Sequence, residues 1–181
     1  MKIGIFGGTF DPFTFAHFEI VNKALNVVNG IIILPTTISY YRDGKTPLFS
    51  FDQRCKIINT FVNKFWSDKW IKVSDLERGR NSFWRTADSV RELKKTYPDD
   101  ELYFILGSDS FNEIETWGEF DYLKENLKFI VVDGRDGVPT VSKLPHETIR
   151  IEHTDMSASS VREKLINSMC SSYIRDIREV I

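Results

Sequence analysis

The sequence predicts an α/β fold, with a doubly wound parallel sheet of five to six strands in a single domain, residues 1–181. Short apolar runs typical of strands alternate with segments of helical periodicity, which is the pattern of a parallel sheet with crossover helices. A chain of 181 residues with 41% hydrophobic content is long enough to bury a sizeable core. No internal repeat, low-complexity tract or linker divides it.

The first half of the chain contains three predicted strands, each followed by a helix. Asn29-Gly30 is a stop signal that ends the first helix, and Pro35 closes the second strand. A polar loop of about a dozen residues follows Pro35 and is long enough to suggest a function. The predicted elements are strand 3–6, helix 16–28, strand 31–34, helix 52–66, strand 70–76 and helix 84–96.

The second half continues the same alternation. The predicted elements are strand 102–106, a short helix before Thr116-Trp117, helix 120–126, strand 127–132, strand 148–151 and helices 157–166 and 171–180. Because crossovers between parallel strands are right-handed, ligands should collect at the carboxyl ends of the strands. Those ends fall at Gly7, Pro35, Gly107 and Asp133.

Composition and charge argue against several classes of partner. The formal net charge is −2, so no bulk attraction to nucleic acid or to an anionic membrane is expected. No apolar run approaches the ~18–20 residues that span a bilayer, and no signal-peptide region precedes the first strand, so we expect a cytoplasmic protein. Cys55 and Cys170 are expected to be free thiols, and His146 and His153 to be surface residues, because their spacing does not suit a metal site.

A glycine-rich loop after the first strand is the most informative segment. Residues 3–17 read Ile-Gly-Ile-Phe-Gly-Gly-Thr-Phe-Asp-Pro-Phe-Thr-Phe-Ala-His. Gly7 and Gly8 let main-chain N–H groups approach an anion, and His17 lies at a helix start, where the dipole favours phosphate. An ordinary glycine turn followed by a satisfied histidine would contain the same residue types. The spacing matches neither the dinucleotide fingerprint, which has a third glycine, nor a P-loop.

The order of these residues resembles the G-x-F/G-G-x-F-D-P-x-(H/T)-x-G-H signature of the nucleotidyltransferase superfamily. The resemblance implies a Rossmann-like fold and ATP phosphates bound at the two positions filled here by Thr14 and His17. Ala16 stands where the signature has Gly. A Thr at the first of the two positions resembles the phosphopantetheine adenylyltransferase branch, which leaves the acceptor substrate open.

A serine-rich segment near the other end of the chain also suggests phosphate binding. Ser157 can cap a helix whose first turn carries further hydroxyls, and Arg162 adds a planar cation. An ordinary helix cap with a solvated Arg is the alternative. Residues 156–162 resemble the I-S-S-T-x-x-R motif of the same superfamily, which implies contact with the β- and γ-phosphates of ATP, although Ala158 replaces a Ser.

Further segments resemble the bacterial nicotinate-mononucleotide adenylyltransferases, the family that makes the dinucleotide in NAD synthesis. The matches are Gly107-Ser108-Asp109 to G-A-D, Thr116-Trp117 to T-W, Thr86-Ala87-Asp88-Ser89 to T-x-D-T, Pro35 with Arg42 seven positions later, and Arg54 in the following helix. This resemblance spans nearly the whole chain. Residues 82–85 depart from the S-Y-T pattern of the family.

The resemblance also implies which residues hold a pyridine mononucleotide. Trp117 offers a flat π-face for an aromatic ring, although a core Trp would leave the same signal. Thr86 begins a helix whose main-chain N–H groups can donate hydrogen bonds to a ring carboxylate or carboxamide. Asp109, beside Gly107, suits ribose hydroxyls, or alternatively a helix N-cap.

The implied reaction is in-line attack of the mononucleotide phosphate on the α-phosphorus of ATP, which depends on positioning and electrostatic stabilisation. No residue resembles a covalent nucleophile, and Mg²⁺ is expected to arrive with ATP, without a metal site of the protein. The expected catalytic residues are His17, Thr14, which would donate a hydrogen bond to phosphate, and Arg162. The expected ATP-binding residues are Gly7, Gly8, Thr9, Phe10, His17, Ser157, Ser159, Arg162, and Arg42 and Lys45, unless these last two only form a solvated basic loop. The expected substrate-binding residues are Thr86, Gly107, Asp109 and Trp117.

ATP and a pyridine mononucleotide are therefore the expected partners, with no nucleic acid and no membrane. The sequence leaves open a homo-oligomer and the choice between nicotinate and nicotinamide mononucleotide. Another adenylyl- or cytidylyltransferase, such as phosphopantetheine adenylyltransferase, is slightly favoured by Thr14. A nucleotide-binding relative without turnover is the alternative suggested by the departures at Thr14, Ala16, Arg85 and Ala158.

Overall fold

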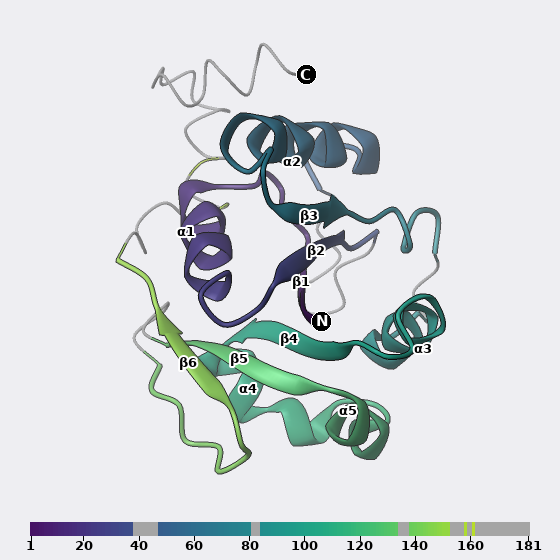
Figure 1. The fold of residues 1–181 in the computed structure, drawn as a ribbon, viewed down its shortest axis with the longest axis vertical. Coiled ribbons are helices and arrows are strands. Elements are labelled where there is room, and N and C mark those ends of the chain that lie inside the picture. The colour runs from purple at the N-terminus through teal and green to yellow at the C-terminus, as the bar shows by residue number, and fades with distance from the viewer. Residues whose placement is uncertain (38–46, 81–83, 134–137, 153–157, 159–160, 162–181) are drawn as a thin grey trace.

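Six strands form one parallel sheet in the order β3-β2-β1-β4-β5-β6, with each strand parallel to its neighbours (Figure 1). The computed structural model describes residues 1–37, 47–80, 84–133, 138–152, 158 and 161. Its strands are β1 (Lys2–Gly8), β2 (Gly30–Pro35), β3 (Trp70–Val73), β4 (Glu101–Gly107), β5 (Lys128–Asp133) and β6 (Glu147–Arg150). The order reverses between β1 and β4, which confirms the predicted doubly wound, Rossmann-like fold.

Helices cover both faces of the sheet, as Figure 1 shows. One face packs against α1 (Phe15–Ala24) and α2 (Phe51–Phe65). The other face packs against α3 (Thr86–Thr96), α4 (Ser108–Asn112), the 3₁₀ helix η1 (Ile114–Thr116) and α5 (Phe120–Asn126). The two crossover directions thus build two separate helix layers on one sheet.

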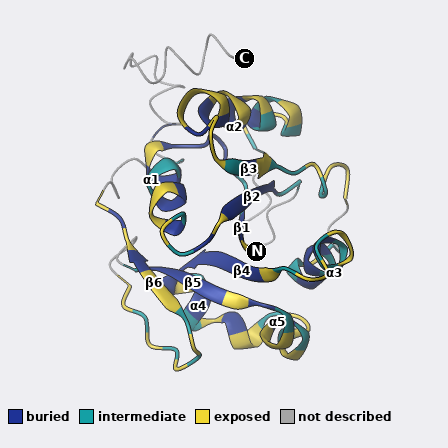
Figure 2. Ribbon diagram, viewed as in Figure 1, coloured by how far each residue is buried: buried dark blue, intermediate teal, exposed yellow. Residues whose placement is uncertain are grey.

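Two apolar cores result from the alternation of side chains along the strands. Ile3 and Ile5 of β1 point into the core beneath α3 to α5, whereas Ile31 and Ile33 of β2 point into the core beneath α1 and α2. Figure 2 shows the central strands buried along most of their length, with exposed positions on the outer sides of the helices, on the edge strand β6 and in the connecting loops. A parallel sheet covered on both faces requires such continuous apolar runs, and these runs made the strands predictable.

Several element boundaries differ from the sequence-based expectation for local reasons. Helix α1 ends at Ala24 rather than at residue 28, because the N–H groups of Val27 and Val28 both donate to the Ala24 carbonyl at 2.9 and 3.0 Å and close a tight turn. Strand β3 ends at Val73, since the Arg78 N–H donates to the Asp75 carbonyl in a turn. The predicted helices 157–166 and 171–180 lie outside the described residues except at 158 and 161.

The α3 boundary has a capping explanation. The predicted start at residue 84 is wrong by two residues, because the Asp88 carboxylate accepts the Arg85 main-chain N–H at 2.9 Å and so begins the helix at Thr86. This contact is half of a capping box, in which a side chain of the first turn satisfies a main-chain donor before the helix.

Close backbone approach explains Gly30 at the start of β2. A Cβ added there would lie 2.3 Å from a ring carbon of Trp70 and 2.5 Å from its carbonyl oxygen. Trp70 is the partner of Gly30 in the β2–β3 register, so the bulky indole can cross the strand only where no side chain stands opposite. Gly30, which predicted the end of the helix, therefore also allows β3 to pair closely with β2.

The minor predictions on cysteine and histidine have mixed outcomes. Cys55 is a half-buried free thiol, as predicted. His146 is not a surface residue but half-buried: its ring packs edge-on against Phe111 at 4.9 Å, and its Nδ1 lies 2.7 Å from the Leu144 carbonyl oxygen. Cys170 and His153 lie outside the described residues. No helix in the described part of the chain is long and apolar enough to cross a membrane.

Candidate active site

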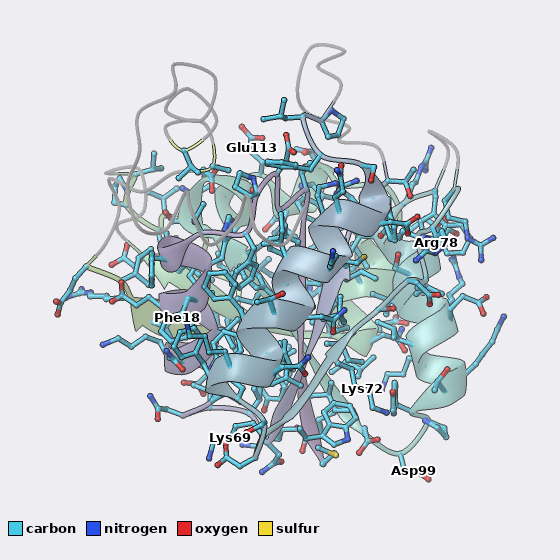
Figure 3. The ribbon with its side chains drawn as sticks, turned by 90° about the horizontal axis from the view of Figure 1, so that it is seen from above. Phe18, Lys69, Lys72, Arg78, Asp99 and Glu113 are labelled. Atoms are coloured by element: carbon cyan, nitrogen blue, oxygen red, sulfur yellow. The ribbon has the colours of Figure 1, made fainter. Side chains whose placement is uncertain are left out.

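A pocket of about 490 Å³ opens at the carboxyl ends of the central strands, where β1 and β4 lie side by side. Figure 3 shows the two ends of the sheet: Lys69 and Asp99 precede β3 and β4, and Arg78 and Glu113 lie toward the opposite end. Nine of the predicted site residues line this pocket: Gly7, Gly8, Thr9, Phe10, His17, Thr86, Gly107, Asp109 and Trp117. The pocket therefore occupies the reversal of strand order, where doubly wound folds bind their ligands.

The glycine loop forms one wall of the pocket. Gly7 and Gly8 end β1, and the main chain then turns through Phe10, whose φ of 49° is rare for a residue with a side chain. The Phe10 ring is buried against Phe6 and His17, with centroids 5.2 and 5.1 Å away. This packing compensates the unusual backbone and presents the loop's main chain to the pocket.

His17 occupies the third position of α1 and is held by the residue that caps this helix. The Thr14 main-chain N–H donates to His17 Nδ1 at 3.0 Å, and the Thr14 hydroxyl lies 2.9 Å from the same nitrogen. Because a main-chain N–H can only donate, Nδ1 carries no proton, and the neutral ring holds its proton on Nε2. The helix cap thus fixes the tautomer of a histidine that lines the pocket.

Thr14 has a different place from the one expected. Its side chain is 0% exposed, and its hydroxyl contacts the imidazole rather than lining the pocket. The direct hydrogen bond from this hydroxyl to phosphate stays a prediction. The geometry makes Thr14 a positioning residue for His17.

A buried arginine, Arg54, holds the glycine loop in place through a hydrogen bond to its main chain; we call this interaction the brace. The Arg54 guanidinium is 2% exposed and donates to three main-chain carbonyls: Nη1 to Thr9 at 2.5 Å and to Thr36 at 2.9 Å, and Nε to Phe49 at 3.2 Å. Burial lowers the pKa of Arg54 from its usual value, and the negative charge of Asp11 opposes this effect. Arg54 therefore ties together the loops that follow β1 and β2 and the segment that enters α2.

Asp11 complements this brace from within the loop. Its two carboxylate oxygens accept the main-chain N–H groups of Leu48 and Phe49, both at 2.9 Å. The family resemblance includes Arg54 without assigning it a role, and Asp11 was recognised only as part of the glycine-loop motif. An arginine on the apolar face of α2, beside Ile57 and Ile58, is the signal that could have revealed the brace.

The opposite wall carries the predicted substrate-binding residues. Trp117 follows η1, is half-buried, and packs edge-on against Phe104 of β4 at 6.0 Å, so that it belongs partly to the second core. Asp109 Oδ1 lies 2.4 Å from where a Cβ on Gly107 would stand, which brings this carboxylate close to the end of β4. Thr86 opens α3 beside them.

A hydrogen-bonded chain on this wall was not predicted. Trp84 Nε1 donates to the Ser89 hydroxyl at 2.8 Å, and this hydroxyl donates to Glu77 Oε1 at 2.9 Å. All three residues line the pocket. Burial raises the pKa of the Glu77 carboxyl, and the Ser89 hydrogen bond offsets part of that rise. Trp84 and Ser89 lie five residues apart at the start of α3, and Glu77 lies twelve residues before Ser89; the sequence does not show that their side chains point toward one another.

The serine-rich segment contributes one described residue, Ala158, to the lining of the pocket. Ala158 lines the pocket with His17, and Val161 is buried in the first core. The predicted residues Ser157, Ser159 and Arg162, and Arg42 and Lys45 of the polar loop, lie outside the described residues. Among the residues that the structure describes, no cluster of three or more histidine, cysteine or acidic side chains could hold a metal ion.

Comparison with known proteins identifies close relatives across almost the whole chain. Residues 5–164 match the family described as cytidylyltransferase-like. A probable nicotinate-nucleotide adenylyltransferase of Shouchella clausii is 31% identical over 91% of this chain and 84% of its own length. Another, from Geobacillus thermodenitrificans, is 32% identical over 96% of this chain and 79% of its own length.

Solved structures agree with these relatives. The nicotinic acid mononucleotide adenylyltransferase of Plasmodium falciparum, complexed with NaAD, has a TM-score of 0.75 and 26% identity, and the match covers 97% of this chain and 93% of that one. A putative nicotinate-nucleotide adenylyltransferase from Vibrio parahaemolyticus, at 19% identity and a TM-score of 0.69, supports the fold alone.

Replacing Arg54 tests the brace. Arg54→Met should lower the free energy of unfolding by about 3 kcal/mol or more, because it strands three carbonyls and leaves the Asp11 charge without its buried counterpart. Arg54→Lys should rescue only part of this loss, since one ammonium cannot reach three acceptors in a fixed fork. Urea unfolding measures both. Arg78→Met, at an exposed arginine, is the control, and a loss below about 1 kcal/mol in Arg54→Met would contradict the role.

Glu77 predicts a pH-dependent stability. Its folded pKa is raised above the ordinary value of 4.5, so the ionised carboxylate destabilises the fold once the pH exceeds both values. Glu77→Gln should therefore raise the Tm by a few degrees at pH 7.5, and the difference should narrow as the pH falls toward 4, where Glu77 is protonated in both states. Thermal unfolding at both pH values measures this. Glu115→Gln, at an exposed position, is the control; an equal gain at both pH values would show that ionisation is not the cause.

Proposed function

Because the chain belongs to the cytidylyltransferase-like family, we propose that it is an adenylyltransferase that joins ATP to nicotinate mononucleotide and releases pyrophosphate. The observation that carries this proposal is that His17, at the start of α1, and Trp117, on the opposite wall, line one pocket. A phosphate-binding element and an aromatic platform in a single pocket suit a reaction between a triphosphate and an aromatic mononucleotide. The named relatives are adenylyltransferases, so they favour this function over the alternatives considered from the sequence.

In this reaction, the mononucleotide phosphate attacks the α-phosphorus of ATP in line, and pyrophosphate leaves. Charge develops on the non-bridging and leaving oxygens, and groups that are already oriented toward it lower the barrier most. We assign that part to the Nε2–H of His17 and to the main-chain N–H groups around Gly8 and Thr9. Thr14 supports it indirectly, because it keeps the proton of the imidazole on Nε2.

The mononucleotide would occupy the wall opposite His17. Trp117 supplies the face on which the pyridine ring stacks, Thr86 and the main chain at the start of α3 receive the ring substituent, and Asp109 accepts hydrogen bonds from ribose hydroxyls. The common position of these residues on the pocket wall, beside Gly107, supports the assignment.

The β- and γ-phosphates would lie toward the serine-rich segment. Ala158 lines the pocket, which supports placing Ser157, Ser159 and Arg162 near the triphosphate. Arg42 and Lys45 follow the end of β2, where Thr36 also lines the pocket, and we propose that they approach the same phosphates.

Mg²⁺ fits this pocket as an ion carried by the substrate. The carboxylates on the described lining are Asp11, Glu77 and Asp109, and both oxygens of Asp11 already accept main-chain hydrogen bonds. These scattered donors suit a metal held chiefly by phosphates and water. Bound there, Mg²⁺ would neutralise charge on the phosphates.

We further propose that residues 1–181 act as one domain in the cytoplasm. The two cores share one sheet, which supports a single domain, and the free thiol of Cys55 fits a reducing compartment.

His17→Ala tests the catalytic assignment. Loss of one oriented donor should lower kcat by a factor of about 100 or more. Pyrophosphate release with ATP, Mg²⁺ and nicotinate mononucleotide measures it. His146→Ala removes a histidine outside the pocket and should leave kcat unchanged. Turnover of His17→Ala near that of the unmodified protein would remove His17 from the mechanism.

Trp117→Ala tests the aromatic platform. It should raise the KM for the mononucleotide about 10-fold, because a stacked ring contributes about 1–3 kcal/mol, while the KM for ATP stays within twofold. Trp117→Phe keeps a π-face and should recover most of the affinity. Equal losses for both substrates would mean that Trp117 supports the pocket as a whole instead of stacking on the ring.

A further inference from the structure

Arg85 places a cation on the substrate wall of the pocket. Among the described residues that line the pocket, it is the only arginine or lysine. The family pattern has no arginine in the segment before Thr86, and the sequence alone treated Arg85 as a departure. Its position on the pocket wall suggests that Arg85 contacts a ligand.

The backbone of Arg85 is fixed on both sides. Its N–H donates to Asp88 Oδ2 at 2.9 Å, and its carbonyl accepts the N–H groups of Asp88 and Ser89 at 3.0 and 3.2 Å. Arg85 is thus the N-cap of α3, and the direction in which its side chain leaves the helix is set by the cap.

The side chain crosses the pocket wall to Gly118. A Cβ added to Gly118 would lie 2.7 Å from Arg85 Nη1, 3.1 Å from Cδ and 3.3 Å from Cζ. The guanidinium therefore lies on the residue directly after Trp117. A residue with a side chain at position 118 would displace it, so the glycine is what allows the cation this close to the aromatic platform.

The acidic groups near Arg85 form their ion pairs with Arg91, although the positive charge of Arg85 also contributes to lowering the pKa of Glu119. Asp88 Oδ1 pairs with Arg91 at 3.2 Å, and the carboxylate of Glu119 forms a second ion pair with Arg91. Within the described part of the chain, the Arg85 guanidinium forms no ion pair or side-chain hydrogen bond. It remains available to a ligand.

We propose that Arg85 is a specificity-determining residue that binds the carboxylate on the pyridine ring and so selects nicotinate over nicotinamide mononucleotide. The inference rests on the proposed function and adds the residue that reads the acid. A guanidinium binds a carboxylate through two parallel charge-assisted hydrogen bonds, whereas a carboxamide offers one neutral acceptor.

The charge of the pocket makes such a residue necessary. The other charged side chains on the described substrate wall are the carboxylates Glu77 and Asp109. A third carboxylate, brought in by the ligand, would be repelled by these two unless a cation lies near the ring. Arg85 supplies that cation beside Trp117.

The test compares the two mononucleotides. Initial rates of pyrophosphate release are measured with ATP, Mg²⁺ and either nicotinate or nicotinamide mononucleotide. Arg85→Gln should lower kcat/KM for the nicotinate substrate about 10- to 100-fold and for the nicotinamide substrate less than about threefold. Arg85→Lys, which keeps the charge without the fork, should lie between. Lys95→Gln, on the same helix but outside the pocket, removes an exposed cation that pairs with Glu92; it is the control and should leave the preference unchanged.

A second variant covers the case in which Arg85→Gln fails to fold. Gly118→Ala keeps Arg85 but displaces its guanidinium, so it should shift the preference in the same direction. The proposal is overturned if a folded Arg85→Gln loses activity equally toward both mononucleotides, as a phosphate contact would predict, or if the unmodified protein prefers the amide.

Failure of the proposed function would look different. In that case, the unmodified protein would release no pyrophosphate from either mononucleotide. Calorimetric binding of the two mononucleotides then still tests Arg85, because Arg85→Gln should weaken only the binding of the acid. Equal affinities of Arg85→Gln and the unmodified protein for the acid would reject the role.

Discussion

The geometry of the pocket depends on one buried guanidinium. Arg54 binds the carbonyls of Thr9, Thr36 and Phe49, which belong to three loops at the carboxyl edge of the sheet. Loops at this edge have no ladder to hold their main chain, so their carbonyls need another donor. Without the brace, the N–H groups that face the pocket would have no fixed direction. The brace thus converts a flexible glycine turn into a wall of defined shape.

At the start of α1, too, one interaction both holds the main chain and shapes the pocket. A helix leaves its first main-chain donors without partners, and an acidic or amide side chain at the third position often accepts one of them. In this chain, an imidazole takes that place. The contact that begins the helix therefore also orients the ring nitrogen that faces the pocket. The hydrogen bond between Thr14 and His17 therefore both caps the helix and sets the tautomer of the imidazole.

The sequence revealed the sheet because its strands are buried on both faces. Runs such as 31–34 and 102–106 are continuous in apolar residues, and the glycines that end β1 and β4 marked the edge where the pocket lies. It could not reveal contacts that depend on the direction in which a side chain points. The chain from Trp84 through Ser89 to Glu77, and the reach of Arg85 to Gly118, join segments with no common spacing. The contact of the Thr14 hydroxyl with His17 was not predicted, because a motif shows which residue is present, not the direction in which its hydroxyl points.

The central pair of strands has a consequence for how the protein is made. In the register of β1 with β4, Ile3 lies opposite Leu102, so the middle of the sheet joins segments separated by about a hundred residues. During synthesis, the glycine loop leaves the ribosome long before the strand that completes its surroundings. Residues 1–80 carry the loop and the guanidinium that braces it, yet they lack the opposite wall. A nascent chain of that length would expose the inner face of β1, and capture of nucleotide must await the arrival of β4.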